Sequence, residues 1–215
     1  MNLILFDVDG TLLDSVGYES GLYGDAITEV LDEEVDRNWS RYRHVTDGGV
    51  LDEIIAQRPR SWPAANIHQR VHDAFVAKLQ MHFARHPQAV REIPGARAWV
   101  KALARRGDCA VGIATGGWHA AAALKLAAIG LDQPLALATG SDARARTAIM
   151  QLAAQRALAG RIPARRIYFG DREWDRAACD ALGFEFIAVG DAVDFPRRIA
   201  DYTRPERVLE MLALS

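Results

Sequence analysis

Short, uninterrupted apolar runs that end in small or acidic residues recur along this chain. Runs of this length are typical of strands buried on both faces of a parallel sheet. We expect strands at residues 3–6, 110–114, 135–137, 167–169 and 184–189. Each is followed by a turn-forming or polar residue, so the carboxyl ends of the strands are the places to look for chemistry.

Between these runs, apolar residues recur at a spacing of three or four, which predicts amphipathic helices. The expected helices cover about residues 94–106, a segment ending near 129, 144–158, 174–182 and 204–212. Strands that alternate with helices of this length predict an α/β fold, with a parallel sheet covered by helices on both faces.

Residues 15–92 break this alternation. They contain no convincing strand and predict helices at about residues 21–31, 49–57 and 64–83. A helical block of this length is too long for a simple connection. We therefore expect an inserted all-helical domain at 15–92, and a core formed by residues 1–14 and 93–215.

Composition narrows the possible partners. The 26 basic and 28 acidic residues nearly cancel, so we expect binding neither to nucleic acid nor to a membrane surface. Two cysteines, Cys109 and Cys179, are too few for a disulfide framework or a zinc site, and both are expected as buried apolar groups. The first residues have no basic region and no long apolar segment, which predicts a cytoplasmic protein.

The first candidate site follows the first expected strand and reads Asp7-Val8-Asp9-Gly10-Thr11. Two acids one residue apart can reach one site if the chain bends, and Gly10 permits that bend. A surface turn or the start of a calcium loop is the alternative. The calcium loop is disfavoured because Leu12 stands where its glycine belongs and a strand precedes the segment.

Two further segments offer groups that bind phosphate. Thr115-Gly116-Gly117 follows the second strand and can present a hydroxyl and backbone N–H groups, although a helix cap is an alternative interpretation. Arg146 lies near the start of a later helix and would neutralise phosphate oxygens. Arg144 competes with it for this role, and a solvated surface arginine is nearly as good an interpretation.

A last acidic segment, Gly170-Asp171-Arg172-Glu173-Trp174-Asp175, follows the fourth strand. Asp171 and Asp175 lie four residues apart, on one face of the helix that begins there. An N-cap and an exposed helix acid are the alternatives. Several carboxylates converging on Asp7 would repel one another unless a cation lay among them, and Mg²⁺ is the ion that carboxylates, waters and phosphate hold best.

Taken in order, these segments resemble the haloacid dehalogenase superfamily, in particular its phosphoglycolate phosphatase and β-phosphoglucomutase-like members with a helical cap after the first strand. The likeness extends over nearly the whole chain. It rests on residues 7–15, Ile93-Pro94-Gly95, Ile113-Ala114-Thr115-Gly116, and Gly170-Asp171 with Asp175. It implies a Rossmann-like core, a cap domain, and hydrolysis of a phosphoric monoester.

The resemblance also implies roles for single residues. Asp7 would be the nucleophile that forms an aspartyl phosphate, and Asp9 the general acid and base. Thr115 and the Gly116 amide would hold the phosphoryl oxygens. Arg146 would stand where the family usually has lysine, a departure because a guanidinium does not simply replace an ammonium.

The metal site follows from the same resemblance. Asp171 would bind Mg²⁺ together with the Asp7 carboxylate and the Asp9 backbone carbonyl, while Asp175 would support the site from its edge. Because Asp9 is present where dehalogenating relatives lack an acid, phosphoryl transfer is favoured over cleavage of a carbon–halogen bond.

The expected function is magnesium-dependent hydrolysis of a small phosphorylated metabolite. Thr46 and Asp47, on a loop with Arg41, Arg43 and His44, are the candidate substrate contacts, and a solvated loop is the alternative. Rival functions are a sugar-phosphate mutase, a phosphonate-cleaving enzyme that uses Lys78, and a receiver or other non-catalytic phosphate-binding protein. The sequence leaves the substrate and the oligomeric state open.

Overall fold

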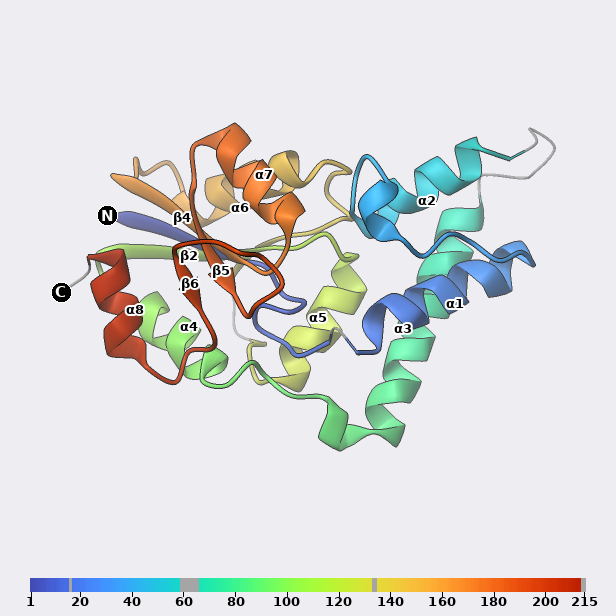
Figure 1. Cartoon of the computed structure of the whole chain (residues 1–215), viewed down its shortest axis with the longest axis horizontal. Coiled ribbons are helices and arrows are strands. Elements are labelled where there is room, and N and C mark those ends of the chain that lie inside the picture. The colour runs from blue at the N-terminus through green and yellow to red at the C-terminus, as the bar shows by residue number, and fades with distance from the viewer. Residues whose placement is uncertain (16, 59–65, 133–134, 214–215) are drawn as a thin grey trace.

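A six-stranded parallel sheet forms the centre of the molecule (Figure 1). The computed structural model describes residues 1–15, 17–58, 66–132 and 135–213. The strands are β1 (Asn2–Phe6), β2 (Cys109–Ala114), β3 (Ala136–Ala138), β4 (Arg165–Gly170), β5 (Glu185–Val189) and β6 (Arg198–Ile199), in the order β3-β2-β1-β4-β5-β6. The predicted α/β fold is confirmed. The two-residue β6 was not predicted, because so short an edge strand leaves no pattern.

Helices cover both faces of the sheet (Figure 1). They are α4 (Ala96–Ala104), α5 (His119–Ala128), α6 (Arg146–Leu158), α7 (Glu173–Leu182) and α8 (Pro205–Leu212). Along β1, Leu3 and Leu5 pack in the apolar cluster formed with α6 and α7, whereas Ile4 and Phe6 pack in the cluster formed with α4 and α8. Successive side chains of a strand point to opposite faces, so this continuous apolar run is buried on both sides.

Several helix ends differ from the predicted ones for local reasons. The helix expected from residue 94 begins at Ala96 because Gly95 has a left-handed backbone, with φ of 81°. The helix expected from 144 begins at Arg146, after an extended Ala145. The helix expected from 49 begins two residues earlier because the Thr46 hydroxyl accepts the Gly49 N–H and caps it.

The inserted segment contains α1 (Glu19–Leu31), a 3₁₀ turn η1 (Trp39–Arg41), α2 (Asp47–Ala56), α3 (Ile67–Arg85) and a second 3₁₀ turn η3 (Pro87–Ala89). Within residues 17–58 and 66–89 it has no strand, as the sequence predicts. The predicted start of α3 at residue 64 lies outside the described residues. The domain boundaries at residues 14 and 92 stay a prediction.

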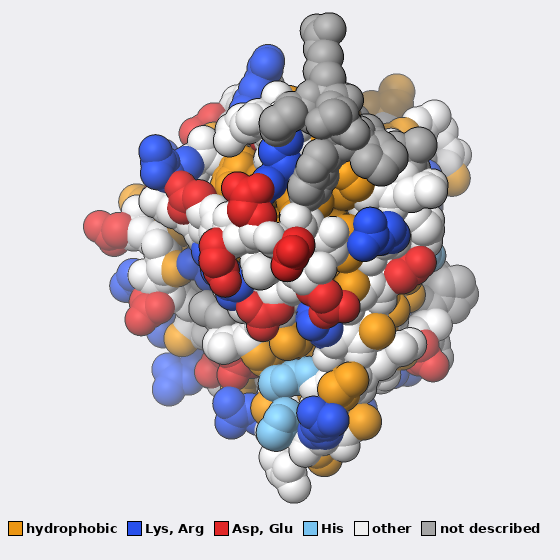
Figure 2. Space-filling view, turned by 90° about the vertical axis from the view of Figure 1, so that its right-hand side faces the viewer, with side chains coloured by type: hydrophobic (Ala, Val, Ile, Leu, Met, Phe, Trp, Pro, Cys, Tyr) orange, Lys and Arg blue, Asp and Glu red, His pale blue; other side chains and the backbone are white. Residues whose placement is uncertain are grey.

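The helices of the insertion have their own apolar cluster, which includes Ile27, Leu51 and Phe75. Trp118 and Ala121 of the α5 region belong to the same cluster, so the insertion packs directly against a helix of the sheet domain. On its outer face, acidic and basic side chains are interspersed (Figure 2).

Cys109 and Cys179 are free and buried, in clusters on opposite faces of the sheet. Both cysteines are thus buried among apolar groups, as predicted. In the part of the chain that the structure describes, every helix is too short or too polar to cross a bilayer. The cytoplasmic location stays a prediction.

Candidate active site

The sheet brings three of the predicted polar segments to one edge. Phe6, the last residue of β1, lies in register with Ile113 of β2 and Phe169 of β4. Asp7 and Thr115 follow the first two of these strands, and Asp171 follows the third. The chain order reverses between β1 and β4, and crevices at such switch points are where open α/β sheets bind ligands.

The turn after β1 depends on a glycine. Gly10 has φ of 70°, which favours a residue without a side chain. A Cβ built on Gly10 would lie 2.1 Å from Oδ2 of Asp171. Gly10 therefore leaves the space that the Asp171 carboxylate occupies, and the turn and the end of β4 fit together only because residue 10 is glycine.

Three buried carboxylates converge at this edge. Oxygens of Asp7, Asp171 and Asp175 all lie within 4.8 Å of one another. Burial, the strongest cause, raises the pKa of Asp7 to about 7 and that of Asp171 to about 8, and it also raises the pKa of Asp175. Oδ1 of Asp7 and Oδ1 of Asp175 are buried and accept no hydrogen bond from the described residues. Such a set of oxygens fits a hard divalent cation.

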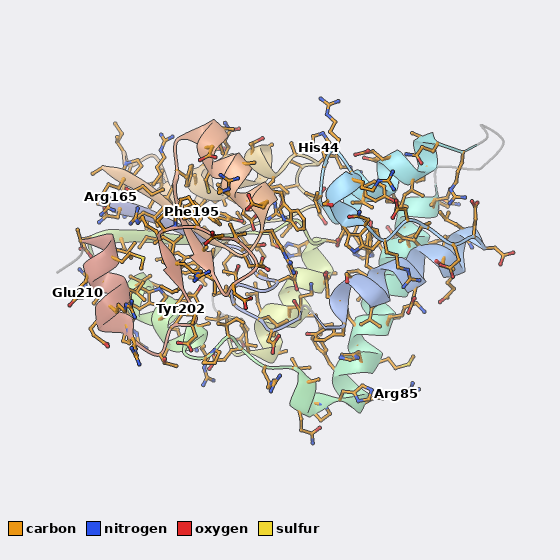
Figure 3. All side chains as sticks on the ribbon, viewed as in Figure 1. His44, Arg85, Arg165, Phe195, Tyr202 and Glu210 are labelled. Carbon is orange, nitrogen blue, oxygen red and sulfur yellow. The ribbon has the colours of Figure 1, made fainter. Side chains whose placement is uncertain are left out.

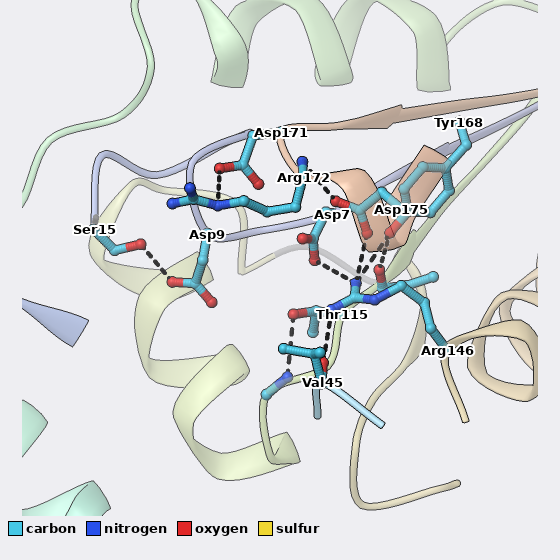
Figure 4. Close-up of polar contacts among 12 residues, drawn as sticks. Asp7, Asp9, Ser15, Val45, Thr115, Arg146, Tyr168, Asp171, Arg172 and Asp175 are labelled. Atoms are coloured by element: carbon cyan, nitrogen blue, oxygen red, sulfur yellow. Dashed lines mark hydrogen bonds and ion pairs between the residues drawn. The ribbon is translucent and has the colours of Figure 1, made fainter. Parts of the chain in front are cut away.

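Arg146, at the start of α6, reaches into this cluster (Figure 4). Its Nη1 lies 3.0 Å from Oδ1 of Asp175 and 3.5 Å from Oδ1 of Asp7. The competing Arg144 instead pairs with Asp52 at 2.6 Å, and its side chain is 44% exposed. Of the two arginines, Arg146 is thus the one placed beside the carboxylates.

Thr115 and Gly116 form the adjoining wall. Thr115 is buried and lines the same pocket as Asp7 and Arg146. A Cβ on Gly116 would lie 2.6 Å from Nη2 of Arg146 and 3.0 Å from the Val45 carbonyl oxygen. The glycine therefore allows the guanidinium and the insertion to approach this loop closely.

Asp9 lines the pocket, but its carboxylate points away from the other acids (Figure 4). It accepts a hydrogen bond of 2.6 Å from the Ser15 hydroxyl. Lys125 of α5 lies 2.7 Å from both of its oxygens and 2.9 Å from Oε1 of Glu19. Although burial opposes the charge, Asp9 and Glu19 raise the pKa of Lys125 above its ordinary value.

Lys125 was not predicted, because the resemblance implies a lysine only at the position that Arg146 occupies. A signal was present in α5, where this lysine shares the buried stripe with Ala121, Ala122 and Leu126. A charged residue on the apolar side of a helix needs buried partners of opposite charge. Glu19 was also missed, since it lies at the start of a helix predicted to begin at residue 21.

The predicted substrate loop lines the pocket next to Gly116. The Asp47 N–H donates to the Gly116 carbonyl at 3.0 Å, and the Asp47 carboxylate accepts the Trp118 N–H at 2.8 Å. The Thr46 hydroxyl donates to the Arg144 carbonyl at 2.8 Å. Burial raises the pKa of Asp47 to about 8.

The other residues proposed for that loop do not line the pocket. Arg41 pairs with Asp36 at 2.8 Å in an exposed position. Arg43 is exposed. His44 lies on the loop before α2, at the end of the insertion nearer to the sheet (Figure 3). Of the residues proposed for substrate contact, Thr46 and Asp47 are therefore the two that line the pocket.

The pocket between sheet and insertion has a volume of about 410 Å³. Several residues that line it were not predicted as site residues, among them Glu19, Tyr23, Arg37, Asn38, Trp39, Arg172 and Trp174. One of them, Arg172, pairs with an acid of the cluster, with Nε 2.9 Å from Oδ2 of Asp171. Apart from Tyr23, which lies inside α1, these side chains come from loops and helix starts, where periodicity does not indicate direction.

Comparison with known proteins agrees with this geometry. A family model described as haloacid dehalogenase-like hydrolase matches residues 1–183. Among curated proteins, no sequence matches the chain.

Solved structures share the fold at low sequence identity. A hydrolase from Pseudomonas syringae has a TM-score of 0.74 at 18% identity, with 100% of both chains covered. CbbY from Rhodobacter sphaeroides, in complex with phosphate, has a TM-score of 0.68 at 20% identity, covering 93% of this chain and 94% of that one. A predicted phosphoglycolate phosphatase from Haemophilus somnus has a TM-score of 0.63 at 16% identity, covering 96% of each chain.

Proposed function

Because the chain belongs to the haloacid dehalogenase-like hydrolases, we propose that it is a magnesium-dependent phosphatase acting on a small phosphorylated metabolite through an aspartyl phosphate. The observation that carries the proposal is the Asp7 carboxylate, which lies in the pocket with one oxygen free of hydrogen bonds. Thr115 and Arg146 lie beside it, so an anion could be held there with its phosphorus next to that oxygen.

Two steps follow from this arrangement. First, an Asp7 oxygen bonds to phosphorus while the bond to the leaving oxygen breaks, and Asp9 gives its proton to that oxygen. Second, Asp9 takes a proton from a water whose oxygen bonds to phosphorus, and the bond from Asp7 to phosphorus breaks. The products are the alcohol and inorganic phosphate, and Asp7 and Asp9 return to their starting states.

The remaining residues neutralise charge and exclude water. Asp7, Asp171 and the Asp9 backbone carbonyl would hold Mg²⁺, with Asp175 at the edge, and the ion would offset the charge of the phosphoryl oxygens. Thr115, the Gly116 amide and Arg146 would bind those oxygens. The insertion would act as the cap, with Thr46 and Asp47 against the leaving group.

The decisive experiment replaces Asp7 by asparagine. Asp7→Asn should lower magnesium-dependent phosphate release from 4-nitrophenyl phosphate by about 1,000-fold or more, because an amide cannot form the phosphoryl ester. Asp36→Asn, the same change at a surface position on the insertion, should leave turnover unchanged. Undiminished turnover in Asp7→Asn would refute the proposal.

A sugar-phosphate mutase of the same fold is the nearest alternative, since the aspartyl phosphate could pass to a second hydroxyl. Free phosphate and isomerised sugar phosphate, quantified in the same reaction, separate the two functions. The phosphonate-cleaving alternative gains no support, because Lys78 pairs with Glu29 at 2.6 Å and does not line the pocket.

A further inference from the structure

A buried lysine lies behind the acidic wall of the pocket. Lys125 is on α5, and its side chain is only 1% exposed. Asp9 and Glu19 both line the pocket, with side chains 24% and 20% exposed, whereas Lys125 does not. The ammonium therefore has no access to a bound substrate, and any influence on the reaction must pass through the two carboxylates.

The contacts of Lys125 fix the carboxylate of Asp9 in one orientation. Both Asp9 oxygens lie 2.7 Å from Nζ, and Oδ1 also accepts the Ser15 hydroxyl at 2.6 Å. A carboxylate held through both oxygens and by a second donor loses the freedom to rotate. Without the lysine, Ser15 would be the side-chain donor left to Asp9.

The third contact of the ammonium reaches the insertion. Glu19 is the first residue of α1, and its Oε1 lies 2.9 Å from Nζ. Lys125 thus joins three elements: the turn after β1, helix α1 of the insertion, and helix α5, which follows Thr115 and Gly116. No other residue described in the structure ion-pairs with both Asp9 and Glu19.

We propose that Lys125 is the positioning residue for Asp9, and that Glu19 anchors it from the insertion. This inference rests on the proposed function, in which Asp9 handles the proton. Lys125 would fix the Asp9 carboxylate in the position from which it can protonate the leaving oxygen. An apolar residue of similar size would fill the space and leave Asp9 free to turn.

The test uses two substrates that differ in their need for a proton. An alkyl leaving group, as in 2-glycerol phosphate, requires protonation, whereas 4-nitrophenolate leaves without it. In single-turnover measurements with excess enzyme, Lys125→Met should slow glycerol release about 100-fold, the scale of a lost general acid, and nitrophenol release less than about 3-fold. The KM for 2-glycerol phosphate should change less than about 3-fold, because Lys125 does not line the pocket.

A double-mutant cycle separates positioning from a merely structural role. If Lys125 acts through Asp9, adding Lys125→Met to Asp9→Asn should cause no further loss of glycerol release. Lys125→Arg should restore part of the rate, and Lys101→Met on α4 is the matched control. Should Lys125→Met fold poorly, the pair Lys125→Met/Glu19→Gln removes one charge of each sign and is measured in the same way.

Equal slowing of both substrates, or a further loss in the Asp9→Asn background, would overturn the inference. If the proposed function itself were wrong, turnover would persist in Asp7→Asn. The Asp7→Asn variant therefore tests the phosphatase proposal, and the Lys125 variants test the positioning role.

Discussion

Two clusters in this molecule each bury one cation among carboxylates, and they differ in how completely their polar atoms are bonded. In the first, Arg146 lies between Asp7 and Asp175. In the second, Lys125 lies between Asp9 and Glu19. The arginine cluster contains buried atoms without a hydrogen bond among the described residues, namely Oδ1 of Asp7, Oδ1 of Asp175 and Nε of Arg146.

The lysine cluster is complete by comparison. Its ammonium makes three contacts of 2.7 to 2.9 Å, which equals the number of its N–H donors. A buried polar atom that makes no hydrogen bond costs free energy, so it is tolerated best where a ligand will supply that bond. The difference indicates that the arginine cluster receives ligands and the lysine cluster holds the surrounding structure.

Substitution of Arg146 should have the largest effect. Arg146→Met removes the cation beside the nucleophile and should lower kcat about 100- to 1,000-fold, the scale for loss of one transition-state donor. Arg146→Lys should recover only part of this, because an ammonium lacks the planar fork. Steady-state kinetics with 4-nitrophenyl phosphate provide the measurement. Full activity in Arg146→Met would contradict the assignment of ligand binding to the arginine cluster.

Magnesium should stabilise the arginine cluster in a pH-dependent manner. The folded state raises the pKa of Asp171 to about 8, so the folded protein binds more protons than the unfolded chain between about pH 4 and pH 8. Without metal, the free energy of unfolding should therefore fall as pH rises through this range. Mg²⁺ at 100 times its Kd should restore about 2.7 kcal/mol at pH 8.

Urea denaturation at pH 5 and pH 8, with and without Mg²⁺, measures this effect. Asp171→Asn is the matched variant, and it should lose both the metal response and its share of the pH dependence. An equal Mg²⁺ response in Asp171→Asn would show that the ion binds elsewhere. Mg²⁺ should also stabilise the Arg146→Met variant, which keeps the three carboxylates.

Substitution of Arg144 should have the smallest effect. Both side chains of its ion pair with Asp52 are nearly half exposed, and surface pairs of this kind contribute about 0–1 kcal/mol. Arg144→Ala should therefore change the free energy of unfolding by less than about 1 kcal/mol, with kcat close to that of the unchanged protein. A loss comparable to that of Arg146→Met would assign the cationic role to Arg144 instead.

The sequence was most informative where parallel strands end. Asp7 and Asp171 could be placed side by side in advance, because the carboxyl ends of neighbouring parallel strands meet at one edge. The choice between Arg144 and Arg146 could not be made, since it depends on the helix beginning at Arg146. Arg144 and Arg146 point in different directions near the start of this helix, and the sequence pattern does not indicate which of them points inward.

Contacts between residues far apart in the chain could not be predicted from the sequence either. Lys125 is 116 residues from Asp9 and 106 from Glu19 along the chain. Periodicity identifies the buried face of α5, but not which groups lie opposite it. The insertion was predicted as helical for the same local reasons, while its pocket-lining loop residues, such as Trp39, depend on how the helices pack together.

The glycine at residue 10 has a consequence for anyone who transplants this site into another scaffold. The carboxylate of Asp171 occupies the space that a Cβ on Gly10 would need, although 160 residues lie between the two positions in the chain. A graft that moves the first loop with any other residue at that position would push away an acid contributed by a different strand. The two positions therefore have to be transferred as one unit.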